Sequence, residues 1–200
     1  VFLEQKPDLE RETAVTRTEI TGGGHTQLRD GEMVSLDHLL HMSLMCSDNV
    51  ATRVLARESG LSHDDFIARM NRKAVELGLS GTRYFEVTGL DERNVSTASD
   101  IARLLHAAAH DPTIQGITTT REYEFRSETR AHAIRNTNRL LYGSYEVLGG
   151  KTGFIGEAGY CFATWVRSQG RDLIAVVLGA PTAATRFADA VRLINKSTVP

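Results

Sequence analysis

Apolar residues between positions 35 and 109 recur every three or four residues, which is the spacing of one face of an α-helix. This pattern predicts four helices, at residues 35–45, 50–58, 62–79 and 96–109. Ser62 with Asp65 three residues later forms a near capping box, and Ser96 or Thr97 can cap the last of the four. In that last helix, Ile101, Leu104, Leu105 and Ala108 are expected to point inward.

The two ends of the chain have a different character. Residues 1–34 show no clear period and are expected to be irregular, with three consecutive glycines at 22–24 in a flexible loop. Short apolar runs at 147–148, 160–166 and 173–178 predict strands, with a hairpin turn at 169–172. A final helix is expected at 182–195. Helices followed by a meander of strands indicate an α+β fold, in which helices pack on an antiparallel sheet.

Composition restricts the classes of function. The chain has 200 residues, of which 41% are hydrophobic and 24% charged, as expected for one folded domain. The net charge of −2 comes without a basic stripe, which argues against a nucleic-acid partner. No apolar run approaches the roughly 20 residues that span a bilayer. Cys46 and Cys161 are either two buried thiols or one disulfide bridge.

Two short motifs are candidates for chemistry. Ser47-Asp48-Asn49 interrupts the apolar pattern between two predicted helices, and Asp48 can cap the second of them. Lys151-Thr152-Gly153 follows an apolar strand. Each alone is weak, because a turn or a solvated strand end explains it equally well. Together, and with Ser-x-x-Lys, they are the set typical of class A β-lactamases and penicillin-binding proteins.

These residue types suit acyl transfer, which needs a proton path, an oxyanion hole and an anchor for a substrate carboxylate. Ser47 can pass a proton to a leaving amine, and Asn49 can hold a substrate amide. Lys151 can supply positive charge near Ser47 and the substrate carboxylate. Thr152 can bind the carboxylate, and Gly153 leaves room for a substrate along the strand edge. The backbone N–H of Phe154 is expected to be one oxyanion donor.

The chain resembles the S11 family of D-alanyl-D-alanine peptidases over almost its whole length. The similarity lies in residues 31–36, 70–74, 77–78, 88–90, 94–98, 135–138, 157–161 and 186–190. Three of these stretches resemble the endopeptidase branch in particular: Asn-Val-Ser-Thr-Ala, Arg-Asn-Thr-Asn and Ala-Gly-x-Cys. The resemblance implies a fold like that of β-lactamases and transpeptidases, with a helical subdomain. It also implies that Arg186 helps to bind the substrate's terminal carboxylate, although a surface arginine is an equal alternative.

The resemblance is incomplete at the nucleophile. The family's Ser-x-x-Lys should precede Ser47, yet the positions three before the four lysines hold leucine or methionine. We therefore expect residues 1–200 to be a single catalytic domain that lacks its N-terminal Ser-x-x-Lys segment, in a processed or truncated chain. The expected activity is that of a serine D,D-carboxypeptidase or endopeptidase, which the sequence does not separate.

The resemblance further implies a peptidoglycan peptide as substrate, β-lactams as covalent inhibitors, no cofactor, and a location in the periplasm or cell envelope. A membrane tether is left open. Two rival functions are a class A β-lactamase, which should carry a Glu-x-x-Leu-Asn loop that is absent, and a non-catalytic cell-wall binding protein.

Other titratable residues are weaker candidates. His38 and His41, like His106 and His110, share a helix face, but no third ligand completes a metal site, and none is expected. Asp100 is expected to be a first-turn helix residue rather than a catalytic acid.

Overall fold

A three-stranded antiparallel sheet forms one half of the molecule. The computed structural model describes residues 1–198. The strands β5 (Glu146–Ile155), β6 (Gly159–Ser168) and β7 (Arg171–Ala180) lie in that order. The turn between β6 and β7 places Gln169 and Gly170 at φ +50° and +73°, the positive values that tight hairpins with the native twist require.

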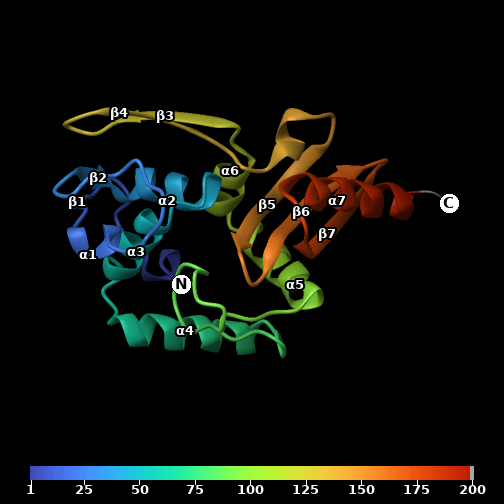
Figure 1. Cartoon of the computed structure of the whole chain (residues 1–200), viewed down its shortest axis with the longest axis horizontal. Helices are drawn as coiled ribbons and strands as arrows, with labels where there is room; N and C mark the ends of the chain where they lie inside the picture. The colour runs from blue at the N-terminus through green and yellow to red at the C-terminus, as the bar shows by residue number, and fades with distance from the viewer. Residues whose placement is uncertain (199–200) are drawn as a thin grey trace.

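Helices cover both faces of this sheet. Helix α7 (Ala183–Thr198) packs Phe187, Ala190 and Ile194 against one face (Figure 1). Phe162 is its main partner on the sheet, with ring centroids 4.8 Å apart. Helix α5 (Ala98–Ala108) lies against the other face, where His106 contacts the Trp165 ring at 5.2 Å. Side chains alternate between the two faces of a strand, so Phe162 and Trp165 face opposite layers.

The other half of the molecule is mainly helical and has its own core (Figure 1). The helix α2 (Leu36–Met45) is its centre, with Leu36, Leu39, Met42 and Met45 almost fully buried. Around it lie the helices α3 (Asn49–Arg57), α4 (His63–Glu76) and α6 (Pro112–Thr119). Shorter elements complete this half: η1 (Leu3–Gln5), β1 (Glu12–Ala14), α1 (Arg17–Ile20) and β2 (Met33–Ser35). The short helix η2 (Arg139–Tyr142) belongs to the sheet half, where its Leu140 is part of the core.

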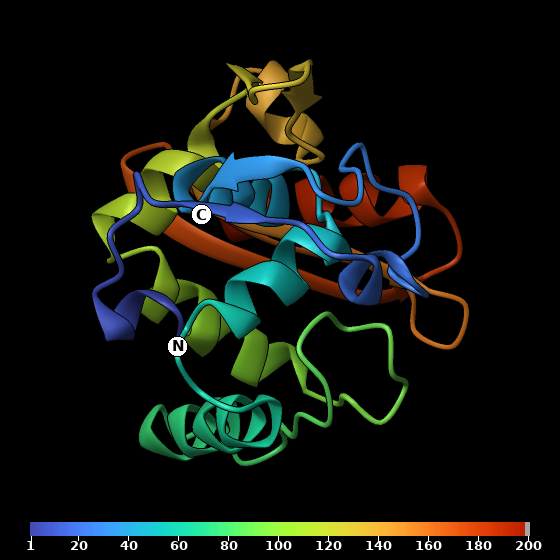
Figure 2. The same ribbon diagram turned by 90° about the vertical axis from the view of Figure 1, so that its left-hand side faces the viewer.

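A long hairpin of β3 (Glu122–Arg126) and β4 (Ala131–Arg135) lies at the opposite side of the molecule from α4 (Figures 1 and 2). His132 and Glu32 anchor it in the interior, where the Nε2–Oε1 distance is 2.6 Å and both side chains are buried. The Ser127 hydroxyl donates a second hydrogen bond to the same carboxylate. Burial alone would raise the pKa of Glu32, but these bonds outweigh it and lower the pKa below its ordinary value.

The α+β prediction is confirmed. The four predicted helices in the middle of the chain, the three strands and the last helix are all present, with bounds shifted by a few residues except in β5, which continues to Ile155. The helix α6 and the hairpin of β3 and β4 were not predicted. The caps at Ser62, Thr97 and Asp48 are formed as expected. The prediction that residues 1–34 are irregular was wrong in part, since β1 pairs with β2 and α1 forms one turn. Elements of three or four residues are too short to show a period.

The inward face predicted for α5 was also only partly right. Ile101, Leu104, Leu105 and Ala108 are half-buried rather than buried, because they line an open cavity instead of packing in a core. Among the described residues 1–198, no helix is long and apolar enough to cross a bilayer.

Candidate active site

All seven residues that the sequence predicted for the site line one cavity of about 710 Å³. The cavity lies between the junction of α2 and α3, the strand β5, and the apolar face of α5. The site residues around it are Ser47, Asn49, Lys151, Thr152, Gly153, Phe154 and Arg186. The α2–α3 junction and the strand β5, about 100 residues later in the chain, therefore line the same cavity.

Ser47 occupies the turn between α2 and α3 in an unusual backbone conformation. Its φ is +59°, in the left-handed region that costs a non-glycine residue roughly 1–2 kcal/mol. Asp48 begins the next helix by accepting a hydrogen bond from the Ala51 N–H at 3.0 Å. The strained turn directs the Ser47 hydroxyl toward β5, where it donates to the Thr152 carbonyl at 3.5 Å.

Lys151 contacts this hydroxyl directly. Its Nζ donates a short hydrogen bond to Ser47 Oγ and another, at 2.9 Å, to the Thr152 carbonyl. Burial lowers the pKa of Lys151 to about 8, with Cys46 opposing the shift and the charge of Arg186 adding to it. A lysine whose pKa is about 8 is partly protonated at that pH. Beside a hydroxyl, it can therefore carry a positive charge or exchange a proton.

Asn49 is held by the glycine loop. Its amide donates to the Gly23 carbonyl at 3.1 Å, and Arg53 donates to the Thr21 and Gly22 carbonyls on the same loop. A Cβ at Gly23 would stand 2.7 Å from a Val50 methyl group, so the loop packs closely on α3. The loop expected to be flexible is therefore tied at several points to the helix that carries Asn49.

Thr152 is held by a residue that the sequence did not assign to the site. The Thr137 and Thr152 hydroxyls are 2.7 Å apart, and Thr137 also donates to the Met45 carbonyl at 3.2 Å. Thr137 thereby links the end of α2 to β5. Its only signal in the sequence was its place in the Arg-Asn-Thr-Asn stretch, which matched a family pattern without indicating a role.

Phe154 and Arg186 form the outer part of the site. Phe154 is 55% exposed, and its ring lies 4.2 Å from that of Tyr160 on β6. The Arg186 guanidinium lies 5.4 Å from the Tyr160 ring and donates to the carbonyls of Gly153 and Cys161 at 3.0 and 3.3 Å. Arg186 is thus bonded to β5 and β6 and is not a free surface arginine.

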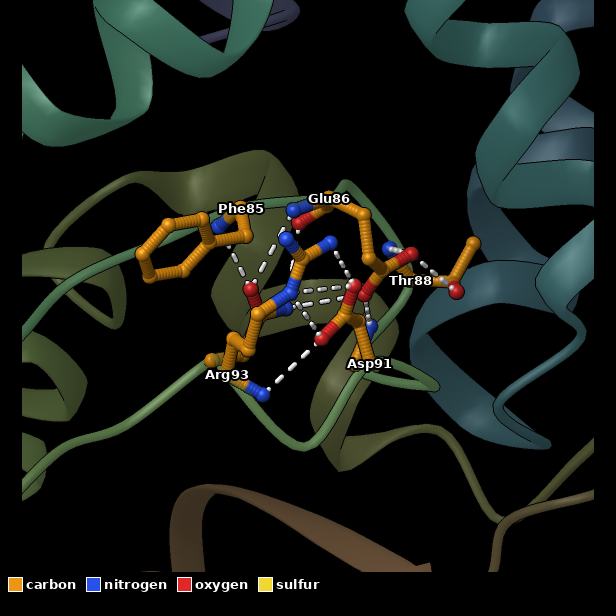
Figure 3. Close-up of polar contacts among 7 residues, drawn as sticks. Phe85, Glu86, Thr88, Asp91 and Arg93 are labelled. Carbon is orange, nitrogen blue, oxygen red and sulfur yellow. Dashed lines mark hydrogen bonds and ion pairs between the residues drawn. The ribbon is translucent and has the colours of Figure 1, made fainter.

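A compact loop at residues 85–94 (Figure 3) contributes Val87, Thr88, Gly89 and Leu90 to the lining of this cavity. The Glu86 carboxylate accepts hydrogen bonds from Thr88 and Gly89, while Asn94 bonds the backbone of Phe85 and Glu86. These contacts hold the loop in one shape. Its Leu90 lines both this cavity and a neighbouring one of about 890 Å³, which contains none of the predicted site residues.

The weaker candidates have structural roles. Asp100 is buried near the start of α5 and accepts hydrogen bonds from the Gly81 N–H and the Thr82 hydroxyl. Cys46 and Cys161 are both free and half-buried, so the bridge is excluded; burial raises the pKa of Cys46 to about 11. Residues 1–198 contain no group of three His, Cys, Asp or Glu side chains placed to hold a metal ion.

Comparison with known proteins gives consistent matches. The model of peptidase family S11, described as D-alanyl-D-alanine carboxypeptidase, matches residues 7–182. A D-alanyl-D-alanine endopeptidase of Escherichia coli is 36% identical over 182 residues, and one of Pseudomonas aeruginosa is 37% identical over 183. Each alignment covers 90% of this chain and 59% of the relative, so the chain spans little more than half of their length.

The fold has a close counterpart among solved structures. The crystal structure of the Streptomyces K15 DD-transpeptidase superposes with a TM-score of 0.87 at 25% identity, covering 94% of this chain and 79% of that one. The transpeptidase-like fold expected from the sequence is therefore confirmed.

Proposed function

The chain belongs to peptidase family S11, and from this premise we propose that it is the greater part of a penicillin-sensitive serine D,D-peptidase. The observation that carries the proposal is the contact between Lys151 and Ser47 in a cavity that also holds Asn49, Thr152 and Arg186. The reaction would transfer the acyl group of a D-alanyl-D-alanine peptide to a serine and then to water.

Ser47 and Lys151 would move the proton. When the peptide C–N bond breaks, the leaving amine needs a proton, and the Ser47 hydroxyl can give its own while taking one from Lys151. The lowered pKa of Lys151 supports this role, because an ammonium with a pKa of about 8 gives up its proton far more readily than an ordinary lysine.

The remaining residues would position the substrate. Asn49 would bind the amide that precedes the scissile bond, and the backbone N–H of Phe154 would donate to the developing oxyanion. Thr152 and Arg186 would bind the carboxylate beyond the scissile bond, because an arginine fork matches a carboxylate. Gly153 would leave the strand edge open to the peptide, and a Cβ there would meet its nearest neighbour at 3.7 Å.

The nucleophile would come from a Ser-x-x-Lys segment of the protein outside residues 1–200, since these residues do not contain that motif. Its serine oxygen would attack the carbonyl carbon as its hydroxyl proton is lost to a neighbouring base, and the leaving amine would gain one proton as the C–N bond breaks. Water would then cleave the ester and restore the serine. The substrate would be a peptidoglycan peptide, which puts the enzyme outside the cytoplasmic membrane.

Intact mass spectrometry of the protein isolated from its own cells, before and after benzylpenicillin, tests this proposal. We expect a mass above the 22.0 kDa of residues 1–200 and one stable penicilloyl adduct. A mass of 22.0 kDa without an adduct would refute catalysis and leave a non-catalytic cell-wall binding protein. Fast hydrolysis of nitrocefin would instead indicate a β-lactamase.

The same preparation separates the two peptidase activities. Chromatography of the products from a D-alanyl-D-alanine pentapeptide reports trimming, and products from a cross-linked dimer report endopeptidase action. The names of the two relatives support the second activity.

A further inference from the structure

A third cavity, of about 500 Å³, adjoins the candidate active site on the side of α7. Its lining includes Arg135, Thr137, Arg139 and Arg186. Arg186 lines both this cavity and the active-site cavity, and Thr137 bonds to Thr152. The small cavity is therefore an extension of the place where a substrate carboxylate would bind.

The three arginines differ in how their charge is balanced. Arg135 forms an ion pair with Glu122 at 3.0 Å. Within residues 1–198, neither Arg139 nor Arg186 has an acidic partner: Arg186 bonds only to carbonyl oxygens, and Arg139 makes no hydrogen bond or ion pair. Two cations thus line one small cavity without a counter-charge.

Both guanidinium groups lie over the same aromatic ring, that of Phe187. Arg186 lies 4.9 Å and Arg139 lies 5.6 Å from the centroid of Phe187. The sum of these two distances is the upper limit of the separation between the two charges. That limit is comparable to the Debye length, which is about 8–10 Å at physiological salt. Burial lowers the pKa of Arg186, and the charge of Arg139 lowers it further. Two like charges at this separation repel each other, and a bound anion would relieve that repulsion.

We propose that Arg139 is a second carboxylate-binding residue, which acts with Arg186 on the carboxylate that follows the scissile bond. The ligand class is a peptide with a free carboxylate on its last D-residue. This inference rests on the proposed function, but it adds a residue that sequence reasoning did not assign. Arg139 is exposed at the start of η2, so it can reach an incoming carboxylate without a change in the backbone.

The test is a ¹⁵N NMR titration of the full-length protein with N-acetyl-D-Ala-D-Ala and, separately, with its C-terminal amide. The pair differs only in the carboxylate, and neither measurement needs the nucleophile. We expect Arg139→Gln to weaken binding of the acid by roughly three- to tenfold and to leave the amide unchanged. Arg139→Lys should keep most of the affinity, since it retains the positive charge.

Arg135→Gln is the matched control. It removes an arginine from the same cavity whose charge Glu122 already balances, so it should change affinity for the acid much less. The ¹⁵N spectrum of each free variant reports whether its fold is intact.

The outcomes separate the two proposals. If Arg139→Gln binds the acid like the wild type while Arg186→Gln loses it, the role of Arg139 is refuted and the proposed function stands. If wild-type protein binds acid and amide equally, or neither, then the carboxylate anchor fails, and the inference about Arg139 fails with it.

Discussion

Replacing Thr137 by valine tests how the site is held together. Valine keeps the branched shape but removes the hydroxyl that bonds Met45 and Thr152. The Met45 carbonyl keeps its bond from the Thr137 N–H at 2.9 Å. The buried Thr152 hydroxyl has no other partner among the described residues. Leaving a buried hydroxyl unpaired costs about 1–3 kcal/mol, so we expect the free energy of unfolding to fall by about that amount.

Urea denaturation followed by circular dichroism measures this loss as a lower midpoint at an unchanged slope. Thr120→Val is the matched control, because the Thr120 hydroxyl donates to the Gly116 carbonyl within its own turn of chain. That control should cost less than about 1 kcal/mol. Equal effects of the two substitutions would refute the argument that Thr137 supports Thr152.

The same variant has an opposite expected effect on ligand binding. Thr137 has one hydroxyl proton, so when it donates that proton to the Met45 carbonyl, the bond between the two hydroxyls is made with Thr152 as donor. A bound carboxylate would have to break that bond. In Thr137→Val the Thr152 hydroxyl is free, and the affinity for N-acetyl-D-Ala-D-Ala should rise by up to about fivefold in the NMR titration. A lower affinity in a folded variant would show that Thr137 itself contacts the ligand.

Further substitutions test other parts of the structure by urea denaturation. Gly23→Ala should cost roughly 1–3 kcal/mol because its Cβ has no space, whereas Gly116→Ala, in open space on a helix, should stabilise by about 0.5–1 kcal/mol. Glu32 has a lowered pKa, so its contribution to stability is present above pH 4.5 and lost as pH falls through its folded pKa; Glu32→Gln should abolish that loss. Lys151 has a pKa of about 8 in the folded protein and 10.5 in the unfolded chain, so the unfolded chain binds more protons between these two pH values. The free energy of unfolding should therefore rise with pH in this range, and Lys151→Met should remove that rise. Ser47→Gly should be about 1 kcal/mol more stable than Ser47→Ala, because both lack the hydroxyl and only alanine is strained at φ +59°.

Local signals in the sequence predicted most of the longer elements but missed α6 and the hairpin of β3 and β4, and contacts between distant residues decided the rest. Helices α2 to α5 are long enough for a period to appear, and their caps lie within a few residues of their starts. Strand β5 was predicted as only two residues, although it runs from Glu146 to Ile155. Glycine, lysine and threonine occupy its middle, at residues 149–153, so the strand signal disappears at the functional motif.

The site shows the same division. Ser47, Lys151 and their neighbours were found because each belongs to a motif of three adjacent residues. Thr137 and Arg139 were missed as site members because their roles depend on partners far along the chain. Thr137 bonds to Met45, 92 positions earlier, and Arg139 shares the ring of Phe187, 48 positions later. A pattern in one stretch carries no signal for such contacts.

Ser47 shows where local and global demands disagree. A turn between two helices at φ +59° is met best by glycine or asparagine, and serine there costs stability without improving the turn. Its hydroxyl gains contacts with Lys151 and with the Thr152 carbonyl, both about 100 positions away, and these contacts need a hydroxyl at this position. Backbone strain of this kind persists where the surrounding structure fixes it and where function requires it. The strained serine therefore supports the assignment of Ser47 to the chemistry independently of the motif that first indicated it.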